Sequence, residues 1–218
     1  MKHAQWIFTG QAEVPAILRI GAYETPVWMQ QRWTEGEFSQ YVRRNGCGHC
    51  CTAMAARLHG VQLDPHQEFA YCRTLWGAPA EDRGQGPWLS TAGIGKVLRS
   101  LGVPAQEYGV KQTGSKAALD SILRALPEGK QVIFTSNPDE YPENPFSKGY
   151  HWVLAADILN DGRILIANSS ENAAPTGIQC VTPEMIEKAL FREATAPEDM
   201  TWGETDRIGE GSGYIIVG

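Results

Sequence analysis

The stretch HWVLAADILNDGRILIANS (residues 151–169) decides the fold. Residues 151–159 and 163–169 are predominantly apolar, which is typical of central strands that are buried on both faces of a sheet. Asn160, Asp161 and Gly162 lie between these two runs, and residues of these types in this order predict a tight turn. The stretch therefore predicts an antiparallel hairpin at the centre of a sheet.

The sequence on either side of this hairpin predicts helices first and strands afterwards. Upstream, good helix formers and apolar residues at helical spacing predict helices at about 47–59, 65–75, 90–101 and 115–126. Asp64 and Pro65 fit the N-cap and first helical positions of the second of these. Further strands are predicted over 131–136, 177–182 and 213–217, with a short helix over 183–191. Residues 1–45 are predicted to form strands and loops, and the whole order favours an α+β fold.

Composition and charge argue against several classes of protein. The 218 residues include 19 basic and 25 acidic ones, a formal net charge of −6, so the basic face of a typical nucleic-acid binder is not supported. No apolar run approaches the roughly 18 residues that span a bilayer. The first twenty residues lack the apolar centre of a signal peptide. We therefore expect a cytoplasmic protein that binds neither nucleic acid nor membranes, or a secreted one if a leader precedes this sequence; the oligomeric state stays open.

The chain has five cysteines, and three of them crowd into NGCGHCC (45–51), directly before the first predicted helix. An odd number with this spacing does not fit a disulfide framework, so reduced thiols are predicted. A helix N-terminus stabilises a thiolate through its free N–H groups, and Cys47 lies at that position. The flanking Gly46 and Gly48 allow a sharp turn and a close approach of substrate. Cys47 is therefore the candidate nucleophile, whereas Cys50 and Cys51 are predicted to pack in the interior.

A cysteine nucleophile needs a base and a group that orients the base. His151 opens the first strand of the hairpin. If the connecting loop has two or four residues, each odd-numbered residue of the first strand pairs with an even-numbered residue of the second. Paired residues point to the same face of a sheet, so His151 and Asn168 share a face. Asn168 is then placed to orient the imidazole. A glutamine upstream of Cys47, either Gln30 or Gln40, is expected to stabilise an oxyanion together with the Cys47 backbone N–H.

Three segments resemble the papain-like cysteine peptidases of the bacteriocin-leader-processing, or double-glycine, type. CGHCCTAMAARLHG (47–60) is similar to the helix that carries that family's nucleophile. TPVWMQQRW (25–33) is similar to the run with glutamine and tryptophan that precedes this helix. HWVLAADILNDGRILIANSS (151–170) is similar to the strand, turn and strand that carry the family's histidine and its Asn or Asp.

The resemblance implies a papain-like fold in one domain over 1–218, with a helical lobe at about 45–126 and a β-sheet lobe at about 130–218 that also takes in the N-terminal strands. It implies hydrolysis of a peptide or isopeptide bond in a peptide or protein substrate, without a cofactor or metal. Cys47 matches the nucleophile, His151 the base and Asn168 the orienting residue. Gln30 matches the family's glutamine by block alignment, whereas Gln40 matches by its shorter distance from the nucleophile.

Several alternatives stay open from the sequence alone. The same residues fit acyl transfer to an amine, and a related fold with an inactive site would only bind peptides. Cys47 and Cys50 have the spacing of a redox dithiol. His49 stands where the family has proline, and Cys47, Cys50 and His49 together have the spacing that begins a zinc or iron–sulfur site. A closed site would need a second pair of ligands, and because Cys72 and Cys180 are isolated in the sequence, no metal is predicted.

Overall fold

The computed structural model describes residues 3–33, 39–77, 89–110, 114–136, 141, 143–190 and 213–218, with the backbone alone for residues 39 and 40. In these ranges the helices are α1 (Ser39–Asn45), α2 (Cys47–Leu58), α3 (Pro65–Leu75), α4 (Thr91–Ser100), α6 (Ser115–Ala125) and α7 (Pro183–Leu190), with 3-10 turns η1 (Gln30–Arg32) and η2 (Leu126–Glu128). The strands are β1 (Gln5–Phe8), β2 (Ala16–Ile20), β3 (Tyr23–Val27), β4 (Ala105–Gly109), β5 (Gln131–Ser136), β6 (His151–Ile158), β7 (Ile164–Ala167), β8 (Ile178–Val181) and β9 (Gly213–Val217).

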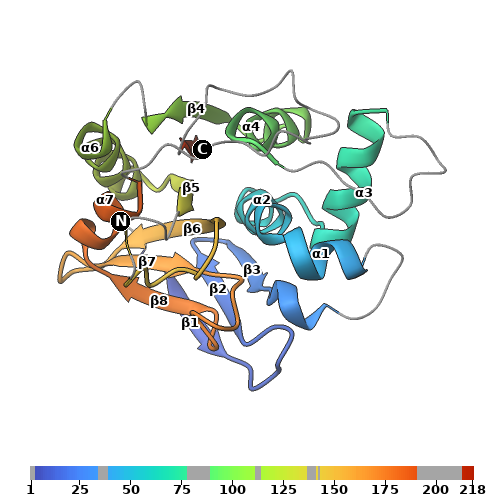
Figure 1. Ribbon diagram of the computed structural model, residues 1–218, viewed down its shortest axis with the longest axis horizontal. Coiled ribbons are helices and arrows are strands. Elements are labelled where there is room, and N and C mark those ends of the chain that lie inside the picture. The colour runs from blue at the N-terminus through green and yellow to red at the C-terminus, as the bar shows by residue number, and fades with distance from the viewer. Residues whose placement is uncertain are drawn as a thin grey trace.

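Two antiparallel sheets organise the structure (Figure 1). One has the strand order β1-β2-β3, and the other has the order β4-β9-β5-β6-β7-β8. The β6–β7 pair is the predicted hairpin, and β5 pairs with the opposite edge of β6. β9 pairs with both β4 and β5. The prediction of an α+β fold with a central antiparallel hairpin is therefore confirmed.

The six-stranded sheet separates two apolar cores. In β6, Trp152 and Leu154 lie in the core that α2 and α4 share with the three-stranded sheet. Val153 and Ala155 lie in the second core, with α6 and α7. This alternation follows from the period of two residues in a strand. His151 begins the same strand, so its side chain and that of Trp152 point to opposite faces.

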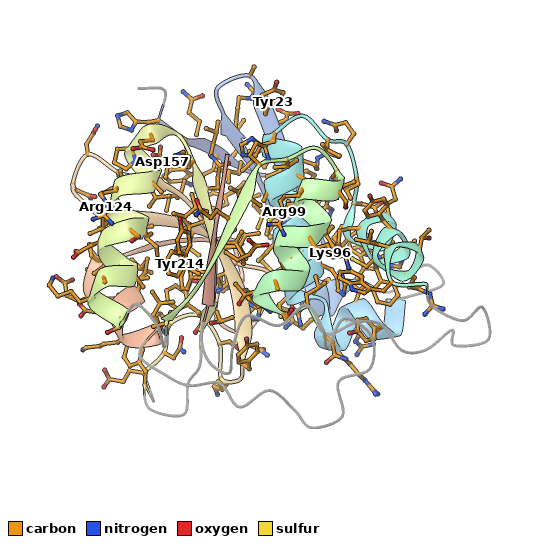
Figure 2. All side chains as sticks on the ribbon, turned by 90° about the horizontal axis from the view of Figure 1, so that it is seen from above. Tyr23, Lys96, Arg99, Arg124, Asp157 and Tyr214 are labelled. Atoms are coloured by element: carbon orange, nitrogen blue, oxygen red, sulfur yellow. The ribbon has the colours of Figure 1, made fainter. Side chains whose placement is uncertain are left out.

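Figure 2 shows the two helical layers from above. Arg124 marks α6 on one side of the β4–β9 pair, and Lys96 and Arg99 mark α4 on the other side. Tyr214 of β9 lies between them and is buried. Its ring stacks on that of Tyr108 in β4, with 4.9 Å between ring centroids. This contact adds apolar burial to the pairing of β9 with β4.

Helix α2, which begins at the candidate nucleophile Cys47, is almost entirely buried. It packs against β3 on one side and β6 on the other, and each of its residues except Arg57 is buried. Small side chains let neighbouring elements approach a helix that is buried on all sides. In α2 these small residues are Gly48, Ala53, Ala55 and Ala56. Its first residue is thereby held against the six-stranded sheet.

The predicted helices and strands from residue 47 onward are confirmed to within about two residues at each end. At α3, Asp64 is the N-cap and accepts from the backbone N–H of Gln67, whose side chain accepts in turn from the Asp64 N–H. Pro65 lies in the first turn, as predicted. This reciprocal capping box explains why the start of α3 is readable in the sequence.

Several elements were not predicted. Residues 1–45 contain η1 and α1 as well as strands, so the prediction of strands and loops alone is wrong there. The seven residues of α1, SQYVRRN, are too few to show a helical period. β4, with the sequence AQEYG, gains its strand conformation by pairing with β9, which is distant in the chain. Within the ranges described above, the helices lack the length and apolar character that crossing a bilayer requires.

Candidate active site

Cys47 is the first residue of α2, and Gly46 separates it from α1. Only 9% of the residue is exposed. Burial raises the pKa of the Cys47 thiol, and hydrogen bonds from the backbone N–H groups of Trp152, Gly48 and Cys47 itself lower it. Two of these N–H groups belong to the first turn of α2, where the helix supplies no carbonyl partner. The donors that stabilise a thiolate at a helix start are therefore directed at the sulfur.

The two glycines that flank the candidate nucleophile lie in close packing, which is tightest at Gly46. A Cβ at Gly46 would lie 2.2 Å from the carbonyl oxygen of Val42 in α1. A Cβ at Gly48 would lie 3.2 Å from Leu89 Cβ and from Trp152 Cδ1. The φ angle of Gly46 is −82°, which any residue adopts. The backbone at Gly46 therefore does not need glycine for its turn, and the close packing of α1 on the start of α2 is what leaves no room for a side chain.

His151 and Asn168 form a buried hydrogen bond, with 2.8 Å between Nε2 and Oδ1. The same Oδ1 accepts from the backbone N–H of Ser170. The Asn168 Nδ2 donates to the carbonyl oxygen of Phe146 and to Oε1 of Gln179. These partners fix the orientation of the amide, so Oδ1 is the acceptor and Nε2 of His151 carries the proton. Nδ1 of the neutral ring consequently keeps its lone pair.

A β-bulge brings these two residues to the same face. Next to the turn, Ile158 pairs with Ile164, and these numbers add up to an even value. The bulge then shifts the register by one residue, so that Leu154 pairs with Ala167 and the two numbers add up to an odd value. In this register His151 and Asn168 point to the same face of the sheet. The shared face was predicted from the loop length, but the actual cause is the bulge.

The thiol of Cys47 lies near Tyr150 and Trp152, the residues before and after His151. It accepts from the Trp152 N–H, and after burial it is the next cause that raises the pKa of the Tyr150 hydroxyl. Burial lowers the pKa of His151 to about 4, although the hydrogen bond to Asn168 raises it in part. The resting site therefore holds a protonated thiol and a neutral imidazole. Within the described residues, the hydrogen bond of the His151 ring is the one to Asn168, and none joins it to Cys47.

Of the two candidate glutamines, the structure describes the side chain of Gln30 but not that of Gln40. Gln30 is buried, its N–H donates to the Ser169 carbonyl, and the Ser169 hydroxyl donates to its Oε1 at 3.4 Å. The same hydroxyl hydrogen-bonds the Cys50 thiol. Gln30 therefore lies next to the residue that follows Asn168, and its NH₂ group is the end that remains to donate. Gln40 lies on α1, and its side chain is outside the part of the chain that the structure describes.

The support around Asn168 was missed in the sequence analysis. Gln179 lies on β8, and its Nε2 donates to the carbonyl oxygens of Pro145 and Ala173. These bonds fix its Oε1 as an acceptor for the Asn168 amide. A glutamine on a strand of mixed burial gives no sequence signal of such a role, because surface glutamine is common.

Cys72 is isolated in the sequence but not in the fold. Glu68 and Cys72 lie one turn apart on α3, His49 comes from α2, and one ligating atom from each lies within 4.8 Å of the others. Cys72 Sγ donates to Glu68 at 3.1 Å, and His49 Nδ1 hydrogen-bonds the other carboxylate oxygen. The available signal was the i, i+4 spacing of Glu68 and Cys72, which places both on one face of a predicted helix.

Two solved structures are similar to this chain. One is a double-glycine motif protease from an AMS/PCAT transporter, solved in complex with the leader peptide. Its TM-score is 0.44 at 15% sequence identity, over 88% of this chain and 90% of that chain. The other is described as a C39-like peptidase from Bacillus anthracis, with a TM-score of 0.46 and 14% identity over 80% of this chain and 90% of that chain.

No protein-family model matches the chain, and no curated protein matches it.

Proposed function

We propose that this chain is a papain-like cysteine peptidase or amide hydrolase of the double-glycine-peptidase type. The observation that carries the proposal is the hydrogen bond between His151 and Asn168, next to the backbone segment that contacts the Cys47 thiol. A base that is held in one tautomer, on the strand whose next residue contacts a thiol at a helix start, suits nucleophilic acyl chemistry. The motif resemblance supports the same assignment of residues.

In the proposed reaction, Nδ1 of His151 takes the proton from Cys47 Sγ, and the sulfur attacks the carbonyl carbon of the substrate. Asn168 stabilises the imidazolium by accepting from its Nε2–H. The carbon–nitrogen bond then breaks, the imidazolium gives its proton to the leaving amine, and a thioester to Cys47 remains. Water gives a proton to His151 and attacks the thioester, after which the proton returns to the sulfur and the acid product leaves.

The oxyanion of each tetrahedral intermediate needs donors that are already in place. The backbone N–H of Cys47 is one proposed donor, because it belongs to the first turn of α2 and lies at the reacting sulfur. The NH₂ group of Gln30 is the other, because its carbonyl end is held by Ser169. Gln40 is the alternative second donor.

A peptide or isopeptide bond is the proposed substrate bond, and this choice follows from the motif resemblance. The three proposed side chains supply a nucleophile, a base that becomes the acid, and an orienting group. The proposed chemistry is therefore complete without a cofactor.

Mass-spectrometric mapping of iodoacetamide labelling at pH 6 tests the proposal. Cys180 is the internal control, because it is partly exposed whereas Cys47 is buried, so accessibility alone favours Cys180. With His151 as base, we expect Cys47 to react more than about tenfold faster than Cys180. The His151→Ala variant should remove that excess and leave the Cys180 rate unchanged. Faster labelling of Cys180, or an unchanged Cys47 rate in His151→Ala, would contradict the proposal.

A further inference from the structure

A buried cluster of His49, Glu68 and Cys72 lies outside the proposed reaction. The three residues are at most 1% exposed. In the part of the chain that the structure describes, they are the His, Cys, Asp and Glu side chains whose ligating atoms gather within 4.8 Å. The rings of Tyr41 and Phe69 pack edge-on against His49, with 5.9 and 5.0 Å between ring centroids. The cluster is thus shielded from water.

Hydrogen bonds alone do not balance this cluster. If His49 is neutral, its Nδ1–H and the Cys72 thiol donate to Glu68, and the carboxylate is a buried negative charge without a cation. If His49 is protonated, the charge is balanced, but its Nε2–H is then a buried donor without a partner among the described residues. Both states are unfavourable, by about 1–3 kcal/mol for an unpaired donor and by more for an unpaired charge. If Glu68 is protonated instead and donates to Nδ1, the charge is removed, but the Nε2–H of His49 is still a buried donor without a partner among the described residues.

A divalent cation matches the charge and the donor set. The thiolate of Cys72, the carboxylate of Glu68 and a neutral His49 together carry two negative charges, so a dication gives a neutral site. Mixed nitrogen, oxygen and sulfur donors are typical of Zn²⁺, whereas Mg²⁺ and Ca²⁺ take six or more oxygen ligands.

The spacing of the sulfur and oxygen ligands is close to what zinc requires, whereas His49 Nδ1 and Glu68 are in closer contact and would move apart around an ion. Tetrahedral zinc with usual bond lengths holds a sulfur and an oxygen ligand about 3.5 Å apart. In this structure Cys72 Sγ lies 3.1 Å from the nearest oxygen of Glu68. Small side-chain shifts would bring all three atoms to one ion, because none lies more than 4.8 Å from another.

The geometry points to a zinc site whose ligands in this chain are His49, Glu68 and Cys72. The ion links α2 to α3, since His49 belongs to the first helix and the other two ligands to the second. It therefore holds the first turn of α2, two residues after Cys47. The role is structural, and it does not depend on the proposed peptidase reaction.

Zinc analysis of the intact chain tests this site. The chain is expressed with added zinc and purified without chelators, and the metal is measured by mass spectrometry. We expect one zinc per chain, and X-ray absorption at the zinc edge should give one sulfur neighbour at about 2.3 Å, with nitrogen and oxygen neighbours. A chain without zinc, or zinc with no sulfur or with two or more sulfur neighbours, would overturn the proposal.

Cobalt substitution assigns the sulfur. Co²⁺ at the site should give a thiolate-to-cobalt charge-transfer band, and Cys72→Ser should lose this band. The matched variants Cys180→Ser and Cys47→Ser should keep it. A band that survives in Cys72→Ser, or that disappears in Cys47→Ser, refutes the assignment. If circular dichroism shows that Cys72→Ser does not fold, the variants Cys50→Ser and Cys51→Ser decide instead. Both should keep the band, which leaves Cys72 as the sulfur ligand, and loss of the band in either would refute the assignment. Zinc retained by Cys47→Ser also separates this site from the proposed reaction.

Discussion

Replacing Asn168 with alanine should weaken both the fold and the reactivity of Cys47. The Asn168 amide makes hydrogen bonds of 2.8 to 3.0 Å to His151, Ser170, Phe146 and Gln179, and the residue is fully buried. At a net value near 1 kcal/mol each, loss of these four bonds lowers the free energy of unfolding by about 4 kcal/mol.

The same change removes the acceptor of the His151 Nε2–H. A hydrogen bond to a charged group is worth about 1.5–3 kcal/mol, so the developing imidazolium is destabilised by a similar amount. Alkylation of Cys47 should then slow by roughly 10- to 100-fold, because each 1.4 kcal/mol is a factor of ten.

Urea unfolding gives the free energy, and mapped iodoacetamide labelling gives the Cys47 rate. Asn144→Ala is the matched control, since Asn144 is a half-buried asparagine that bonds Ser136 and the Phe146 N–H. It should lose about 1–2 kcal/mol of stability and leave the labelling rate unchanged. Asn168→Asp keeps an acceptor for His151 and should label faster than Asn168→Ala. An unchanged labelling rate in Asn168→Ala, or an equal fall in both alanine variants, would refute the reasoning.

Three further perturbations test other parts of the site. The pKa of His151 is lowered to about 4 in the folded chain. In the unfolded chain His151 takes up a proton near pH 6.5. The contribution of the neutral His151 to the free energy of unfolding is therefore complete above that pH and falls by up to about 3 kcal/mol as the pH drops to 4. We expect the His151→Gln variant to lose less unfolding free energy between pH 7 and pH 4 than the unchanged chain, as measured by urea unfolding. An equal loss in the variant and the unchanged chain would contradict this prediction. Cys47→Ser should abolish peptide hydrolysis and change unfolding by less than about 1.5 kcal/mol, whereas residual hydrolysis would exclude Cys47 as the nucleophile. Gly46→Ala should destabilise by about 2–3 kcal/mol, because its Cβ would lie 2.2 Å from the Val42 carbonyl oxygen; unchanged urea unfolding would disprove the tight contact.

Local signals in the sequence predicted the elements that local chemistry determines. Asp64 and Pro65 identify the start of α3, because cap and first-turn preferences act within one turn. The apolar runs of β6 and β7 identify central strands, because both faces of this sheet are covered by helices.

Elements that depend on distant contacts were not predictable in this way. β4 has no alternating pattern of its own and becomes a strand by pairing with β9. The bulge in β6 leaves no mark in the sequence, so the relation between His151 and Asn168 was predicted from a wrong premise about the loop. The direction of side chains between helices is also a tertiary property, which is why the approach of His49 to Glu68 and Cys72 was missed.

The place of β9 inside the sheet has a consequence for the order of assembly. β4 and β5 do not pair with each other, and β9 fills the position between them. During synthesis both strands therefore keep an open edge until residues 213–217 arrive. Open edges attract other strands, and contacts so distant in sequence form slowly. Shortened chains that lack residues 213–217 should consequently self-associate, even though the segments that contain Cys47, His151 and Asn168 are already complete.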